Sequence, residues 1–105
     1  MANKYTPFVP IHPGEVIKDE IEARGLTQKH LAGLIGLPYT MLNEILNGKR
    51  NLTTETALLF EAALDINAEM LMGIQSEYSL QKARKDNTLL KRFNAIRRAV
   101  AAAAF

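Results

Sequence analysis

The sequence predicts an all-α protein, and three observations support this prediction. Apolar residues recur at the three- and four-residue spacing of one helical face, whereas alternating runs of β-branched residues are missing. Capping residues and glycine or proline stop signals separate these segments at short intervals. A length of 105 residues fits one small domain with an extension, because a second full core would need a longer chain.

The N-terminal residues predict an extended arm followed by a helix. Pro10 and Pro13 favour an arm over residues 1–14, because proline restricts the backbone and lacks an N–H donor. A first helix is expected over residues 15–24, where apolar residues return at helical spacing. Gly25 then ends this helix.

Two short helices with a glycine-containing turn are expected next. Thr27 is a suitable N-cap for a helix over residues 28–35, because its hydroxyl can accept a first-turn N–H. Gly36 permits the left-handed backbone of a tight turn. Pro38 can open a third helix that runs to about residue 46. The residues expected to pack these two helices together are Leu31, Ala32, Ile35, Leu37, Leu42 and Ile45.

Three further helices are expected in the second half of the chain. Thr53 caps a fourth helix that runs to about residue 64, and Asn67 caps a fifth that reaches residue 83 or beyond. A last helix is expected over residues 88–104, which are rich in good helix formers. One stripe of the fifth helix is apolar, and either forms a dimer surface or packs on the first and fourth helices. Its members are Met70, Leu71, Ile74 and Tyr78.

Composition argues against several classes of function. The chain lacks cysteine, which rules out disulfides and thiolate metal sites and suits the cytoplasm. His12 and His30 fall on different elements without paired ligand spacing, so no metal site is expected. No phosphate-binding glycine loop, no nucleophile beside a base and no run of eighteen apolar residues occurs. We therefore expect no enzyme, no cofactor and no membrane span.

The third helix has a polar face that could bind DNA. Its apolar residues fall on one side, and Thr40, Asn43, Glu44 and Asn47 fall on the opposite side. A polar strip of this kind on the second helix of a helix-turn-helix can read base edges in the major groove. Four further residues flank the strip and suit phosphate contacts: Gln28, Lys29, Lys49 and Arg50. On periodicity alone, a solvated helical face remains the alternative.

A family resemblance favours DNA binding. The segment TQKHLAGLIGLPYTMLNEILNGKR resembles the Cro/C1-type, XRE-like helix-turn-helix, in which a Gln opens the second helix and Asn-Gly-Lys closes the third. The resemblance implies a lambda-repressor-like fold of five helices over residues 15–86, with a C-terminal helical extension over residues 87–105. It further implies base-facing and backbone-facing residues. The former are Tyr39, Thr40 and Glu44, and the latter are Gln28 and Asn47.

A narrower resemblance concerns three other segments. IHPGEVIKDEI, LNGKRNLTTETAL and YSLQKARK are similar to HigA-type antitoxins. This implies a homodimer that binds double-stranded operator DNA, represses its own operon and neutralises a RelE/HigB-like mRNA-cleaving toxin. Two alternatives remain open at this point. One is a stand-alone transcriptional regulator without a toxin, and the other is a protein-binding helix-turn-helix module.

Charge is distributed unevenly and indicates where a toxin could bind. Residues 1–66 hold six Lys/Arg against eight Asp/Glu, whereas residues 67–105 hold seven against three. RelE-like toxins are typically basic, so the acidic first helix is the better candidate contact, through Glu15, Asp19 and Glu22. The tail would contribute through an apolar stripe that includes Phe93 and Ile96. That tail could also bind a partner or dimer mate, contact DNA phosphates, or fold back on its own domain.

Overall fold

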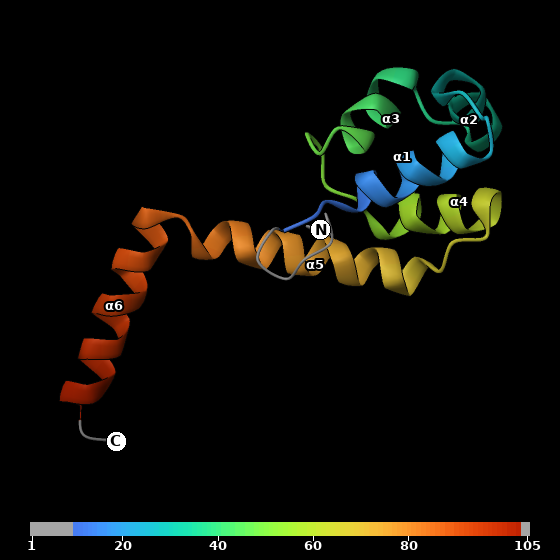
Figure 1. Cartoon of the computed structure of the whole chain (residues 1–105). Coiled ribbons are helices and arrows are strands. Elements are labelled where there is room, and N and C mark those ends of the chain that lie inside the picture. The colour runs from blue at the N-terminus through green and yellow to red at the C-terminus, as the bar shows by residue number, and fades with distance from the viewer. Residues whose placement is uncertain (1–9, 104–105) are drawn as a thin grey trace, which may run out of the picture.

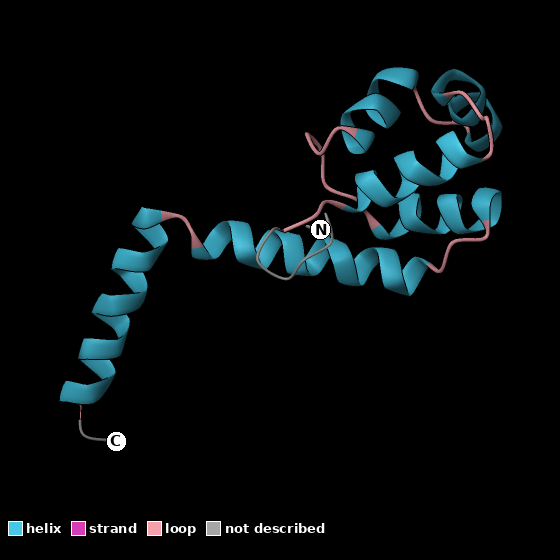
Figure 2. Ribbon diagram, in the orientation of Figure 1, coloured by secondary structure: helices cyan, strands magenta, loops and turns pink. Residues whose placement is uncertain are grey.

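A computed structural model describes residues 10–103, which form six α-helices and no strand (Figures 1 and 2). The predicted all-α class is confirmed, with five helices in the body and one in the extension. The elements are α1 (Pro13–Ala23), α2 (Gln28–Ile35), α3 (Tyr39–Leu46), α4 (Thr54–Leu64), α5 (Ala68–Arg84) and α6 (Asn87–Ala102).

Side-chain caps define where the helices begin. The Thr27 hydroxyl accepts a hydrogen bond from the His30 N–H at 3.1 Å, and Thr53 and Asn67 cap α4 and α5 in the same way, as predicted. Helix α1 begins at Pro13, two residues earlier than expected. The reason is that His12 acts as its N-cap and accepts from the Gly14 N–H at 2.9 Å.

Glycines in the left-handed conformation end the two short helices. Gly36 has a φ of 70° and Gly48 a φ of 73°. The backbone N–H that follows each glycine donates to a carbonyl of the preceding helix. The Leu37 N–H donates to the Ala32 oxygen at 3.0 Å, and the Lys49 N–H donates to the Glu44 backbone oxygen at 2.8 Å. These contacts satisfy carbonyl groups that the helix end would leave free. The turn between α2 and α3 is therefore tightly defined.

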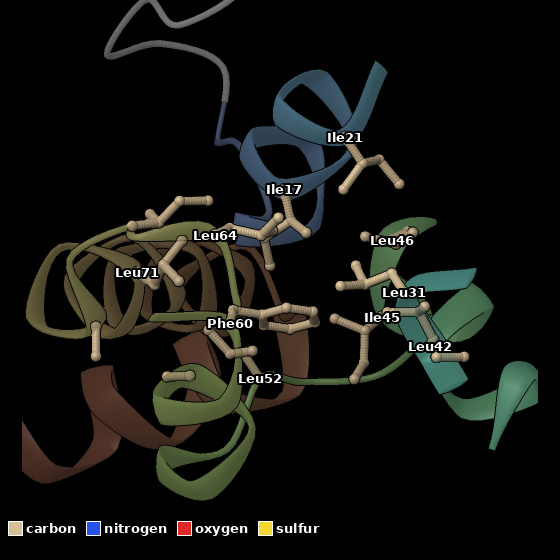
Figure 3. Close-up of a cluster of buried hydrophobic side chains, with 14 residues drawn as sticks. Ile17, Ile21, Leu31, Leu42, Ile45, Leu46, Leu52, Phe60, Leu64 and Leu71 are labelled. Carbon is tan, nitrogen blue, oxygen red and sulfur yellow. The ribbon is translucent and has the colours of Figure 1, made fainter. Parts of the chain in front are cut away.

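The core lies where α1 to α5 converge (Figure 3). Ile17, Leu31, Leu42 and Phe60 come from four different helices, and each is fully buried. Leu71 adds a fully buried residue from α5. Burial of each such side chain contributes about 1.5–3 kcal/mol, so this cluster supplies most of the driving force that joins the helices.

The positions of α5 and α6 bear on two alternatives that the sequence leaves open. In the apolar stripe of α5, Leu71 is buried in the core and Met70 is exposed, and the helix packs on α1 and α4. The packing role is thus confirmed for part of the stripe. The fold-back alternative for the tail is wrong, because α6 projects from the body and has no buried residue (Figure 1). The Asp86 carboxylate accepts a hydrogen bond from the Leu89 N–H at 3.0 Å, so the tail begins as a separate helix with its own N-cap.

Helices α1 and α3 approach each other closely at Gly14. A Cβ atom at Gly14 would lie 2.0 Å from the carbonyl oxygen of Ile45, a distance that no side chain tolerates. Gly14 is therefore required for the backbone of α1 to rest against the end of α3. This contact fixes the position of α3 relative to the core.

Gly14→Ala should lower the free energy of unfolding by about 1–3 kcal/mol, because the added methyl forces α1 and α3 apart. Gly73→Ala is the matched control, since nothing lies within 4 Å of a Cβ at that helical position. It should raise stability by about 0.5–1 kcal/mol through helix propensity. Chemical denaturation of both variants checks the pair. Equal effects would contradict the close approach.

Candidate nucleic-acid interface

Helix α3 presents one apolar face and one polar face, as predicted. Leu42, Ile45 and Leu46 are buried against the body. Thr40 and Asn47 are exposed on the opposite side. Tyr39 is also exposed, at the first turn of the helix. The side of α3 that is free to meet another molecule is therefore the polar one.

A hydrogen-bond network joins this polar face to α2. Asn43 Nδ2 donates to Gln28 Oε1 at 3.0 Å, which links the middle of α3 to the first residue of α2. Asn47 Nδ2 donates to the backbone oxygen of Asn43 at 2.9 Å. Three of the predicted DNA-binding residues thus form one continuous polar strip. Because Asn43 uses its nitrogen to hold Gln28, its role in the free protein is to position the strip.

Two other predicted residues form an ion pair. Arg50 Nη2 lies 3.3 Å from Glu44 Oε1, and both side chains are partly exposed. A pair of this kind contributes little to stability, about 0–1 kcal/mol. Its main consequence is electrostatic, because Glu44 offsets the charge of a cation that could otherwise meet phosphate. Lys29 and Lys49 are exposed beside the same strip.

A buried glutamine, which the sequence pattern did not predict, holds the loop that carries the cations. Gln75 of α5 accepts from the Leu52 N–H at 2.7 Å and donates to Asn51 Oδ1 at 3.2 Å and to Ser79 Oγ at 3.0 Å. These bonds satisfy both ends of a buried amide. The signal available in the sequence was a polar residue one turn after the core residue Leu71.

His12 contacts the same loop and was also not predicted to support it. It is buried, and its ring lies against Gly48, where a Cβ would be 3.6 Å from His12 atoms. Its ring meets that of Tyr78 edge to face, with centroids 5.0 Å apart. A polar residue directly before a proline at the start of a helix is an N-cap signal that could have identified it.

The surroundings of His12 favour the neutral imidazole. Burial lowers the pKa of His12 below its ordinary value of 6.5, and the charge of Lys82 acts in the same direction. The backbone of Arg50 and the carboxylate of Glu15 oppose this shift without cancelling it. A neutral ring also leaves Nδ1 free to accept the hydrogen bond from Gly14 that caps α1.

The residues predicted to contact a toxin fall on two separate elements. Glu15, Asp19 and Glu22 lie on α1, and Glu15 and Glu22 are exposed. Phe93 and Ile96 lie on α6, which projects away from α1 (Figure 1). The structure therefore does not bring the two groups into one site.

Residues 10–103 offer little support for other classes of site. No group of three His, Asp or Glu side chains in that range is arranged to hold a metal ion. Nor is any helix of the described part of the chain long and apolar enough to cross a membrane. The polar strip and its flanking cations are thus the main candidate surface.

Comparison with known proteins decides the family. The model of the helix-turn-helix family HTH_3 matches residues 17–71, which extend from α1 to the first turn of α5. The chain belongs to this helix-turn-helix family. Virulence-associated protein I of Dichelobacter nodosus is 31% identical over 77 residues, which cover 72% of this chain and 71% of that protein.

The fold of this chain is similar to that of solved antitoxin structures. The antitoxin HigA of Pseudomonas aeruginosa, solved with the higBA promoter, is 32% identical with a TM-score of 0.67, over 70% of this chain and 82% of HigA. An addiction module antidote protein of the HigA family from Coxiella burnetii is 28% identical with a TM-score of 0.69, over 79% and 92%. The resemblance to Cro/C1-type and HigA-type proteins is therefore confirmed.

Acidification should lower the free energy of unfolding, because protonation of His12 is less favourable in the folded state. The pKa of His12 is lower in the folded state than in the unfolded state. The contribution of His12 to the free energy of unfolding is therefore complete above pH 6.5 and is lost as the pH falls through the folded pKa. In His12→Asn, which retains an N-cap, the free energy of unfolding should depend less on pH between about 7 and 5. Denaturant titrations across this range measure the slope of the unfolding free energy against pH. His30→Asn is the control, because it also removes an imidazole. An unchanged slope in His12→Asn would show that the ring does not titrate with folding.

Proposed function

We propose that this chain is an antitoxin that binds operator DNA through α3, represses its own operon in the cytoplasm and neutralises a RelE/HigB-like toxin. The observation that carries the DNA-binding part is the exposed polar strip on α3, held to α2 by the Asn43–Gln28 hydrogen bond. The solved HigA relative, which is 32% identical, is described together with the higBA promoter. In this proposal the protein acts by binding rather than by catalysis.

The interface separates into base contacts and phosphate contacts. Tyr39 and Thr40 lie in the first turn of α3, where a helix inserted in the major groove meets base edges, and Glu44 follows Thr40 one turn later on the same face. The Gln28 amide nitrogen remains a donor after its oxygen has accepted from Asn43, which suits a phosphate oxygen. Asn47 also lies on the strip, at the α3 C-cap.

Three cations complete the interface and set its strength. Lys29, Lys49 and Arg50 are exposed beside the strip and suit phosphates. Arg50 must first leave Glu44, which accepts from cytosine in this arrangement. So few cations support only weak binding by one chain, and residues 1–66 carry more acidic than basic residues. We therefore infer that two chains bind two half-sites related by two-fold symmetry.

Base and phosphate contacts predict different effects of substitution. Thr40→Ala should change preference at one base pair by about 1–3 kcal/mol, because a base contact is lost. Lys49→Ala with Arg50→Ala should weaken binding to every sequence and reduce the slope of log affinity against log salt by about two. Mobility-shift titrations use the DNA upstream of this chain's reading frame and single-base variants of it.

Thr88→Ala, at an exposed threonine of α6, is the matched control for Thr40→Ala and should leave both affinity and preference unchanged. A Glu44→Gln variant sharpens the test, because it frees Arg50 and should strengthen binding to unrelated DNA. Sequence-independent losses of equal size from Thr40→Ala and from the double cation variant would rule out direct readout by α3.

The toxin-binding part of the proposal rests on the charge of α1. Glu15, Asp19 and Glu22 follow one another at intervals of four and three residues, so they share one face. The buried residues Ile17 and Ile21 occupy the other face. An acidic face that is fixed by the core is electrostatically suited to a basic, RNA-handling toxin. The apolar residues Phe93 and Ile96 of α6 would add at most a secondary contact.

Reversing the charge of this face should slow toxin binding. Glu15→Lys with Glu22→Lys should lower the association rate with the toxin encoded beside this chain by about tenfold at low salt. Glu69→Lys with Glu77→Lys makes the same change in net charge on exposed positions of α5 and is the control. A chain lacking residues 88–105 should still bind. Loss of binding on that deletion alone, with the α1 reversal harmless, would assign neutralisation to the tail. Absence of any toxin gene beside this one would favour the stand-alone regulator.

A further inference from the structure

Helix α6 carries an apolar stripe that its own chain covers only in part. Leu89 and Phe93 are half-buried, whereas Ile96 and Val100 are 55% and 50% exposed. The four residues recur at intervals of four, three and four, which places them on one face. The helix has no acidic residue between its cap and its end, and its four charged side chains are all basic: Lys91, Arg92, Arg97 and Arg98.

A second uncovered apolar surface lies on the body, between α2 and α4. Leu34 is 62% exposed and Leu58 is 52% exposed. An open pocket of about 420 Å³ is lined only by apolar residues, namely Leu34, Ile35, Leu59, Ala62 and Ala63. Glu55 and Asp65 are exposed at the two ends of α4. Arg24 donates to the Leu64 carbonyl at the same end as Asp65, but its charge is offset by an ion pair with Glu20. Acidic groups therefore flank this surface. We call it the α2–α4 patch, and it comprises Leu34, Ile35, Leu58, Leu59, Ala62 and Ala63.

We propose that α6 of one copy of this chain docks on the α2–α4 patch of a second copy, and that the exchange is reciprocal. The two surfaces match in both respects that govern docking. An apolar stripe meets an apolar pocket, and a helix with only basic charges meets a surface bordered by carboxylates. Reciprocal docking produces a closed two-fold dimer rather than an open chain of copies.

The α6 helix of the same chain does not fill the patch in the structure, because α6 leaves the far end of α5. Helix α5 has 17 residues, which corresponds to about 25 Å, and only Lys85 and Asp86 separate it from α6. Figure 1 shows α6 at the end of α5 that is remote from α2 and from the end of α4. Pairing of α6 with α6 of another copy would bring eight basic side chains together without a carboxylate from either helix. The opposite charge beside the patch avoids that repulsion.

Docking on the patch leaves the candidate DNA interface free. The patch lies at the C-terminal end of α2 and on α4, whereas Gln28 lies at the first residue of α2 and the polar strip lies on α3. The inference deepens the proposed function, because it supplies the dimer that a two-fold operator requires. It can fail independently of DNA binding, since a different dimer would still place two α3 helices on DNA.

The experiment is sedimentation equilibrium of the full chain and of two exposed-site variants. Ile96→Glu alters the α6 stripe and Leu34→Glu alters the patch, and each alone should weaken dimerisation at least tenfold. An equimolar mixture should recover part of the dimer, because the patch variant supplies an intact α6 and the α6 variant supplies an intact patch. Leu80→Glu, at an exposed leucine of α5, is the control and should dimerise as the unaltered chain does. Far-ultraviolet circular dichroism verifies that all variants keep their helices.

Cysteine cross-linking gives a second, direct measurement, because the chain has no cysteine of its own. Leu34→Cys and Ile96→Cys chains, mixed under mild oxidation, should form a mixed disulfide in preference to either homodimer. A monomeric unaltered chain at tens of micromolar would overturn the proposal. So would loss of the dimer in Leu80→Glu alone, lack of recovery in the mixture, or an Ile96→Cys homodimer as the main product. If any of these results occurred while Lys49→Ala with Arg50→Ala still weakened DNA binding by the otherwise unaltered chain, only the dimer assignment would have failed.

Discussion

The contact between Gly14 and the carbonyl of Ile45 fixes how α3 lies on the core, and the candidate interface depends on that position. Leu42 and Ile45 direct one face of α3 inward, so the polar face is turned outward by necessity. The glycine-ended turn at Gly36 then sets α2 against α3 closely enough for the Asn43–Gln28 bond. Packing and polar contacts together present one rigid strip, which is what recognition of base edges requires.

The cationic loop after α3 is positioned by a different kind of interaction. Gln75 binds the backbone of Leu52, and the buried ring of His12 lies against Gly48. Lys49 and Arg50 lie between Gly48 and Leu52 in this loop. Helix α5 and the start of α1 therefore both determine the position of the two cations. The ion pair between Arg50 and Glu44 lowers the effective charge of the free protein. Weak non-specific attraction combined with a fixed strip favours discrimination between sequences over simple charge attraction.

The sequence predicted the helices and both faces of α3 because these follow from local signals. Thr27, Thr53 and Asn67 cap their helices as expected, since capping needs only neighbouring residues. Gln75 was missed because its partner Leu52 lies 23 residues away in the chain. The ring contacts of His12 with Gly48 and Tyr78 are also distant in sequence, although its cap on Gly14 is a local signal. Periodicity also could not tell that α6 would project from the body, because an amphipathic stripe does not specify its partner.

The central claim is that the strip on α3 and the adjoining cations meet DNA. Amide chemical shifts of the isotopically labelled full chain, followed during titration with the DNA upstream of its reading frame, test this most directly. The largest changes should fall at Gln28, Lys29 and residues 39–50, and should saturate at two chains per duplex. Changes centred on α6 or on the acidic face of α1, with residues 39–50 unaffected, would contradict the account.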